Sequence, residues 1–113
     1  WQQFSNIVFS IHPYDLWNNG GLGAFIDQVH AQNLALIIGE YAIQTDQNVE
    51  PAARAVFDEA VPRGVGIVVW HWDSGDANDL TVNTSRGGGW EIDDCTNPTN
   101  LSWFGQQVWN TNH

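Results

Sequence analysis

The sequence has 113 residues, which is enough for one domain with a modest hydrophobic core. Hydrophobic residues make up 42% of it, a composition typical of a folded protein and far from a disordered one. Three basic and thirteen acidic residues give a net charge of −10, which repels nucleic-acid phosphates and anionic lipid surfaces. We therefore expect neither nucleic acid nor a membrane as a partner. No apolar segment approaches the roughly 20 residues of a spanning helix, and the first residues lack a basic-then-apolar signal segment.

The cysteine and tryptophan content bears on which metal sites, disulfides and ligand contacts the chain can form. Cys95 is the single cysteine, so we expect no internal disulfide and no cysteine-based metal site. There are seven tryptophans, and indole faces commonly stack on flat apolar ligand surfaces, although about half of these residues are expected to fill the core. No cofactor is predicted.

Ile7 to His12 form a compact apolar run that predicts a buried strand. Pro13 follows and biases His12 toward an extended backbone, so His12 and Tyr14 face the same way if that geometry persists. Both side chains could then reach one cleft. The alternatives are a buried, hydrogen-bonded imidazole for His12 and a rim aromatic for Tyr14.

Apolar residues recur at helical spacing from Leu22 to Val29 and predict a helix over 22–32 that ends at Asn33. His30 lies on the expected polar face of this helix. Without a partner one turn away, we do not expect it to bind a metal ion.

The run from Leu34 to Ala42 is apolar until it reaches an acid. Its first five residues are too few for a helix and fit a strand buried on both faces, as in a parallel sheet. Glu40 would lie at the carboxyl end of that strand, where α/β barrels carry their catalytic residues. The alternative is a strand-end acid that is solvated or paired with an arginine.

A polar loop over 44–48 leads into a second predicted helix, with Asn48 as its N-cap and Pro62 at its end. Val65 to Trp70 form the third apolar run and the third predicted strand. Because strands and helices alternate with short connections, the sequence predicts repeated βα units, a parallel sheet and the α/β class.

The segment after Trp70 is long, polar and rich in glycine, and it precedes a final helix from about Leu101 to Trp109. A loop of this kind is usually functional or disordered. Asn83 and Asn100 each begin an N-glycosylation sequon, which matters only in a source that glycosylates secreted proteins.

Two patterns in this segment could suggest ligands. Asp73, Asp76 and Asp79 lack the spacing of an EF-hand loop, so we expect solvated loop acids rather than calcium ligands. The three glycines at 87–89 lack the following helix with Lys and Ser or Thr that a phosphate loop needs. Neither pattern predicts a metal or phosphate site.

Three strand ends carry groups suited to sugar chemistry. The segments that contain them read NIVFSIHPY, LALIIGEY and GVGIVVWHW, and they resemble the sixth-, seventh- and eighth-strand motifs of glycoside hydrolase family 5. The closest likeness is to the bacterial β-mannanase branch, whose last helix resembles the tail NLSWFGQQVWN. The resemblance covers nearly the whole chain.

The resemblance implies a fold. Family members are (β/α)8 barrels of roughly 250 residues, so residues 1–113 would be the C-terminal three βα units, a partial barrel within a single catalytic domain.

The resemblance also implies roles for five residues. Glu40 would be the nucleophile, Tyr14 would orient it through a hydrogen bond, and His12 would contact the sugar or the acid/base side. Trp70 and Trp72 would bind substrate, with Trp70 forming the floor of the subsite for the reacting sugar.

One part of the family's machinery has no counterpart in this sequence. Retaining hydrolysis needs two carboxyl groups roughly 5 Å apart, and the family's acid/base Glu follows an Asn at the end of the fourth strand. Glu50 and Glu59 lie on a predicted outer helix and Glu91 lies in a loop, so they are poor replacements. We therefore expect this chain by itself to be inactive.

Three classes of function stay open. The first is part of a secreted endo-β-1,4-glycanase that binds β-linked polysaccharide and takes the rest of its barrel from a missing segment or another chain. The expected polysaccharide is mannan, with cellulose as the alternative. The second is a carbohydrate-binding module, although an antiparallel sandwich would be usual there. The third is a non-catalytic half-barrel whose open strand edges drive oligomerisation.

Overall fold

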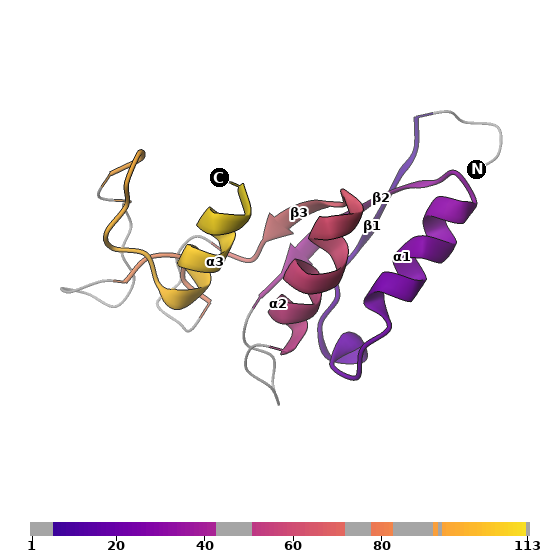
Figure 1. Cartoon of the computed structure of the whole chain (residues 1–113), viewed down its shortest axis with the longest axis horizontal. Coiled ribbons are helices and arrows are strands. Elements are labelled where there is room, and N and C mark those ends of the chain that lie inside the picture. Colours follow the sequence, from indigo (N-terminus) through magenta and orange to yellow (C-terminus); the bar gives the residue numbers. More distant parts are fainter. Residues whose placement is uncertain (1–5, 43–50, 72–77, 83–91, 93, 113) are drawn as a thin grey trace.

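The computed structural model describes residues 6–42, 51–71, 78–82, 92 and 94–112. Its strands form one parallel sheet in the order β1-β2-β3, and they are β1 (Val8–Ile11), β2 (Ala35–Tyr41) and β3 (Gly66–Val69) (Figure 1). The predicted α/β class and its parallel sheet are confirmed.

The connections between the strands are helical. The helix α1 (Leu22–Ala31) lies between β1 and β2, and the consecutive segments that lead to β3 are α2 (Pro51–Ala55), η2 (Val56–Ala60) and η3 (Val61–Arg63). A short 3₁₀ turn, η1 (Asp15–Trp17), follows β1, and α3 (Trp103–Asn112) comes last. Within the described residues, no helix is long and apolar enough to cross a membrane.

The second predicted helix is present but is not a single regular α-helix. Its hydrogen bonding changes from α in α2 to π in η2 and to 3₁₀ in η3, and it ends at Gly64, which has a φ of 70°. Pro62 has no N–H to donate, which frees the turn before it from the regular α ladder. The expected N-cap, Asn48, lies outside the described residues.

The helix α1 begins and ends with contacts that differ in kind. No side chain of its own caps its first turn; instead, Glu59 of η2 accepts a hydrogen bond of 2.5 Å from the N–H of Gly23. At the other end Asn33 adopts a φ of 55°, and the N–H of Leu34 returns to the carbonyl of Val29. The predicted end at Asn33 is confirmed.

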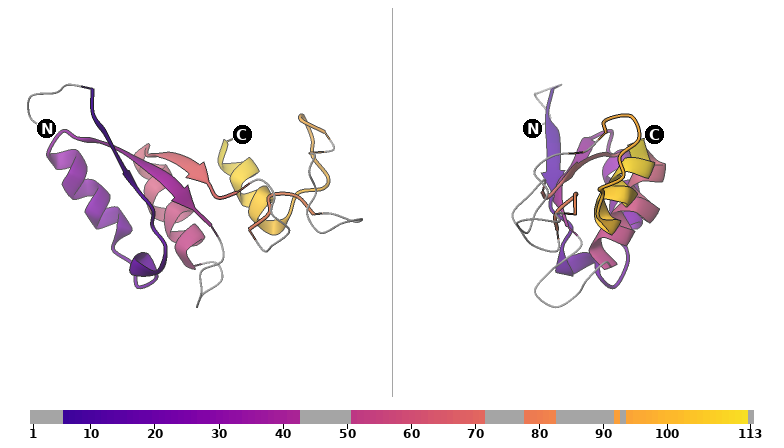
Figure 2. Two further views of the ribbon diagram at one scale, coloured as in Figure 1. Left: turned by 180° about the vertical axis from the view of Figure 1, so that it is seen from behind. Right: turned by 90° about the vertical axis from the view of Figure 1, so that its left-hand side faces the viewer.

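The helices cover one face of the sheet, which we call the helix-covered face. Figure 2 (left) shows the molecule from behind, with the strands in front of α1 and α2. Strand residues that alternate toward the helices pack into the core: Phe9, Ile11, Leu36, Ile38, Tyr41, Ile67 and Val69.

The opposite face, which we call the open face, carries the other set of strand residues: Val8, Ser10, Ala35, Ile37, Gly39, Gly66 and Val68. Val8 is 55% exposed and Val68 is 53% exposed. The expectation that the central strand is buried on both faces is therefore wrong for this chain, because no described helix or strand covers the open face of β2.

The helix α3 packs beyond β3 through aromatic and backbone contacts. Phe104 is fully buried, and its ring meets Tyr41 edge-on at 5.7 Å, as does the ring of Phe57. Gly105 lies so close to the carbonyl of Leu80 that a Cβ atom there would overlap it.

The Cα radius of gyration, 15.5 Å, exceeds the roughly 13 Å of a compact domain of this size, so the molecule is elongated.

Candidate active site

The end of β1 presents two polar side chains at the carboxyl edge of the sheet. Pro13 is fully buried, and the N–H of Tyr14 bonds to the carbonyl of His12 at 3.0 Å, which closes a tight turn. His12 follows Ser10 by two residues, so both lie on the open face. The turn brings Tyr14 to the same edge.

The strand β2 is irregular where Glu40 lies. Its register against β3 shifts between Ile38 and Tyr41, both of which are buried in the core. Gly39 and Glu40 together therefore oppose a single residue of β3, which is a β-bulge. Regular alternation would have turned Glu40 toward the helices, and the bulge turns it to the open side instead, where His12 lies.

Glu40 joins the two side chains from the end of β1. The hydroxyl of Tyr14 donates a hydrogen bond of 2.6 Å to Oε1 of Glu40, and Nδ1 of His12 lies 3.7 Å from Oε2. The side chains of Glu40 and His12 are 29% and 52% exposed, so solvent reaches the carboxylate. Both side chains reach Glu40, but they do so through the tight turn at Pro13 and not through the extended backbone on which the expectation depended.

Tyr14 is a dependable hydrogen-bond donor. Burial raises the pKa of its hydroxyl above the ordinary value of 10.0, and the hydrogen bond to Glu40 and the charge of Glu40 raise it further. The phenol therefore stays protonated across the neutral range. It holds one carboxylate oxygen of Glu40 by a short bond, and the other oxygen faces His12.

The strand β3 brings Trp70 to the same edge. Its N–H bonds to the carbonyl of Tyr41 at 2.7 Å, so Trp70 lies beside the residue that follows Glu40. Trp70 is 48% exposed, its ring meets that of His71 edge-on, and the peptide bond between these two residues is cis. A half-exposed indole can stack on the apolar face of a sugar ring. Trp72 lies outside the described residues.

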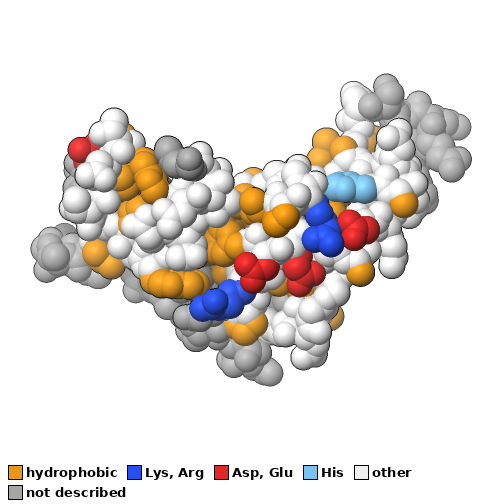
Figure 3. Space-filling model, in the orientation of Figure 1, with side chains coloured by type: hydrophobic (Ala, Val, Ile, Leu, Met, Phe, Trp, Pro, Cys, Tyr) orange, Lys and Arg blue, Asp and Glu red, His pale blue; other side chains and the backbone are white. Residues whose placement is uncertain are grey.

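Glu59 lies on the other side of the sheet from Glu40. Besides its hydrogen bond with Gly23, it neighbours Arg63, whose Nε donates to Oδ1 of Asp27 at 2.8 Å. Figure 3 shows acidic and basic side chains gathered over this outer surface. The predicted outer position of Glu59 is confirmed, while Glu50 and Glu91 lie outside the described residues.

Asp79 corrects one expectation, because it is 6% exposed and not solvated. Its carbonyl accepts a hydrogen bond from Oγ of Ser102 at 2.6 Å, and the same oxygen of Ser102 accepts from the N–H of Gly105 at 2.9 Å. Ser102 is thus the N-cap of α3, which explains why this helix begins later than expected. Asp79 is buried where α3 packs on the segment 79–82.

The remaining ligand candidates are not assembled into a site. His30 is exposed near the end of α1. Asp73 and Asp76 lie outside the described residues, as do Asn83 and the glycines at 87–89. Among the residues that the structure describes, no group of three or more His, Cys, Asp and Glu side chains could hold a metal ion.

Sequence reasoning missed two residues beside the candidate site. Gly39 contributes to the bulge, and Ser10 lies against it from β1. The available signal was a glycine inside a strand pattern directly before an acid, since such a glycine marks a bulge or a close backbone approach.

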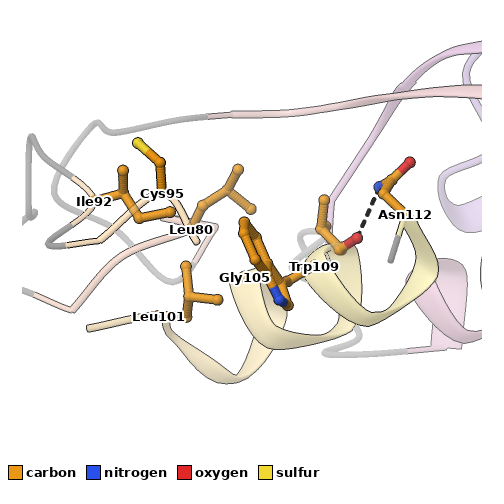
Figure 4. A pocket seen from close by; sticks show the side chains of 8 residues that line it. Leu80, Ile92, Cys95, Leu101, Gly105, Trp109 and Asn112 are labelled. Carbon is orange, nitrogen blue, oxygen red and sulfur yellow. Dashed lines mark hydrogen bonds between the residues drawn. The ribbon is translucent and has the colours of Figure 1, made fainter. Parts of the chain in front are cut away.

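A pocket of about 310 Å³ lies elsewhere, beside α3 (Figure 4). It is lined by Leu80, Ile92, Cys95, Leu101, Gly105, Val108, Trp109 and Asn112. Cys95 is free and exposed, and none of the described lining residues carries a carboxylate. Among the described residues, the carboxyl edge of the sheet is therefore the candidate active site.

Parallel βα units that gather a carboxylate, a phenol, an imidazole and an indole at the carboxyl edge of the sheet match the architecture of α/β barrels, which carry their sites at that edge. A family model described as "Cellulase (glycosyl hydrolase family 5)" matches residues 2–76. The match covers more than half of the chain, which therefore belongs to glycosyl hydrolase family 5.

Solved structures agree with this assignment. The catalytic domain of a mannanase from Streptomyces sp. SirexAA-E is 26% identical, with a TM-score of 0.64 over 94% of this chain and 31% of that one. A β-mannanase from Streptomyces thermolilacinus with mannohexaose shares the fold at 24% identity, with a TM-score of 0.63 over 96% of this chain and 33% of that one. The chain thus spans about a third of each structure, as a part of a (β/α)8 barrel would. No curated protein matches significantly.

Proposed function

We propose that this chain is the nucleophile-bearing part of a retaining endo-β-1,4-glycanase that hydrolyses β-mannan. The observation that carries the proposal is the 2.6 Å hydrogen bond from Tyr14 to Glu40 at the carboxyl edge of the parallel sheet. A strand-end carboxylate that is both oriented by a protonated phenol and open to solvent fits a nucleophile better than a structural acid.

In the proposed mechanism, Glu40 attacks the anomeric carbon of the bound sugar. The bond from that carbon to the glycosidic oxygen breaks, and its electron pair leaves with the oxygen, which a second carboxylic acid protonates. Water then hydrolyses the glycosyl-enzyme ester and restores Glu40. Tyr14 occupies Oε1 throughout, so Oε2 is the oxygen positioned to attack.

Trp70 and the second carboxylic acid complete the proposed site. Trp70, which is half exposed beside Tyr41, would place the apolar face of the reacting sugar. The acid must lie roughly 5 Å from Glu40 and would come from the part of the barrel that this chain does not span. The open face would be covered by the same part. Secretion, inferred from the family resemblance alone, stays a prediction.

Mannan is the proposed substrate because both solved structures described above are mannanases. Cellulose is the second candidate, because the matching family model is described as a cellulase. Hydrolysis of β-mannan and of carboxymethyl cellulose by the full-length protein that contains this chain separates the two. Cleavage of cellulose alone would replace mannan by cellulose as the substrate.

The test of the site is Glu40→Gln in that full-length protein, with turnover and melting temperature measured on the same sample. The amide is nearly isosteric but cannot form the glycosyl ester, so we expect hydrolysis to collapse while the melting temperature stays near the wild-type value. Glu59→Gln is the matched control. It changes a carboxylate on the helix-covered side, so turnover per folded molecule should be unaffected.

The opposite pattern would overturn the assignment. If Glu40 is a structural acid, Glu40→Gln loses a charge-assisted hydrogen bond worth roughly 1.5 to 3 kcal/mol and lowers the melting temperature, while turnover stays near wild type.

A separate measurement addresses the partial barrel. This chain by itself should not hydrolyse either polysaccharide, because a missing acid alone forfeits roughly 10²- to 10⁴-fold in rate.

A further inference from the structure

The position directly before Glu40 has no side chain, and β1 fills the space that a side chain would take. A Cβ atom built on Gly39 would overlap Oγ of Ser10 and would lie 3.3 Å from Cβ of Ser10. It would also lie 3.4 Å from Nε2 of His12. Ser10 of β1 therefore depends on the absence of a side chain at Gly39, and the ring of His12, just after β1, lies at contact distance from that position.

The imidazole of His12 spans the distance between that position and the candidate nucleophile. Its Nε2 edge lies over Gly39, while its Nδ1 edge lies 3.7 Å from Oε2 of Glu40. The side chain of His12 is 52% exposed. A group added to Gly39 would therefore touch the ring on the edge opposite the one that faces Glu40.

We propose that Gly39 is a positioning residue, which acts by leaving room for His12 to lie across β2 and face Glu40. The inference rests on the proposed function, because it assigns Gly39 a part in placing groups around the nucleophile. The bulge and the missing side chain then work together: the bulge turns Glu40 to the open side, and Gly39 lets His12 approach it.

A second glycine on the same face supplies the comparison. Gly66 lies on the open face of β3, and among the described residues a Cβ atom there would meet only Cγ2 of Ile37, at the ordinary contact distance of 3.5 Å. Gly66→Ala therefore makes the same chemical change on a neighbouring strand without pressing on His12. It is the matched control for Gly39→Ala.

The experiment is a double-mutant cycle on the full-length protein, with kcat and KM measured on the polysaccharide that the wild type hydrolyses. A catalytic group misplaced by about 1 Å can lower the reaction rate by roughly 100-fold. Gly39→Ala should therefore lower kcat/KM by roughly 10- to 100-fold, mostly through kcat. Gly66→Ala should change it by less than about 2-fold. In the His12→Ala background, Gly39→Ala should cost no more than about 2-fold further.

If the effects of Gly39→Ala and His12→Ala are additive, Gly39 acts without His12 and the proposal is overturned. Wild-type kinetics in Gly39→Ala would also overturn it. If Gly39→Ala does not fold, the cycle is measured in the Ser10→Gly background with Gly39→Val. The valine side chain extends beyond the Cβ position that already lies 3.4 Å from Nε2 of His12, and Ser10 no longer obstructs it. The same lack of additivity is expected there.

Failure of this inference is distinguishable from failure of the proposed function. An inactive Glu40→Gln with an additive cycle removes only the role of Gly39. A fully active Glu40→Gln removes the proposed nucleophile, and the role of Gly39 with it.

Discussion

The two faces of the sheet differ sharply although they belong to the same three strands. On the helix-covered face, Leu36, Ile38 and Tyr41 of β2 are almost completely buried. On the open face, residues such as Val8 and Val68 are about half exposed, and glycine and serine occupy the positions nearest the candidate site. One face thus contributes core burial, and the other carries the polar chemistry.

Residues of the helix-covered face stabilise the fold of this chain, whereas residues of the open face contribute little to its stability in the absence of other strands. Apolar burial on the helix-covered face stabilises the chain directly. The valines of the open face, Val8 and Val68, stay about half exposed in this chain, which is expected if other strands cover them in a complete barrel. Substitutions on the two faces should therefore have different consequences, in stability on one side and in turnover on the other.

The largest effect on stability is expected from Ile38→Ala on the helix-covered face. Ile38 is fully buried in the core. Its truncation leaves a cavity under α1 and η2, which should lower the free energy of unfolding by about 2–5 kcal/mol. Urea unfolding of the full-length protein measures this loss. A cost below about 1 kcal/mol would show that the core beneath the helices is not formed as described.

Tyr14→Phe, at the carboxyl edge, should affect turnover rather than stability. It removes a hydrogen bond to a charged group, worth about 1.5–3 kcal/mol, which corresponds to a fall in kcat/KM of roughly 10- to 150-fold if the bond matters in the transition state. Steady-state kinetics with a melting curve on the same sample provide the measurement. Lowered stability with unchanged kcat/KM would assign Tyr14 a structural role.

Alkaline pH should sharpen the contrast between the two tyrosines. The pKa of Tyr41 is raised by burial alone, and that of Tyr14 is raised by burial first and then by Glu40. A group whose pKa is raised in the folded state stabilises it fully below the unfolded pKa, about 10 for tyrosine, and this contribution is lost as pH rises above that value.

Melting temperatures should accordingly fall as the pH is raised above about 10. Tyr41→Phe should reduce the fall more than Tyr14→Phe, because Tyr41 is fully buried and Tyr14 lies at an open edge. The hydroxyl of Tyr41 has no hydrogen-bond partner within the described residues, so its removal should cost little at neutral pH. Equal alkaline profiles for all three proteins would contradict this account.

The smallest effect is expected from Val68→Ala on the open face, measured on this chain by itself. Because Val68 is 53% exposed, its truncation should change the free energy of unfolding by less than about 0.5 kcal/mol. A loss approaching that of Ile38→Ala would mean that the open face is covered even in the isolated chain, for example by a second copy.

Much of the fold could be predicted from local patterns. The runs that end at His12, Glu40 and Trp70 became three parallel strands, and the spacing after Leu22 became α1. These predictions succeeded because period and run length report directly on strands and helices. The second helix was less regular than expected, and α3 began at Trp103 because Ser102, read only as part of a sequon, caps it.

The candidate site could be predicted in part. Three strand ends of a parallel sheet must share an edge, so the proximity of His12, Tyr14 and Glu40 followed from topology. The burial of Asp79 did not follow, since it depends on how α3 packs against a segment far from it in sequence.

The sequence by itself determined the alternation of strands and helices, the carboxylate at the end of the central strand and the family to which the chain belongs, because these are carried by local periodicity and by motifs. Only the tertiary structure decided which way Glu40 points. Strict alternation would have turned its side chain toward the helices, and the shift in register against β3 turns it to the side of His12 and Tyr14. That shift is a property of paired strands: the glycine before the acid could signal a bulge, but only the pairing with β3 shows where the register changes.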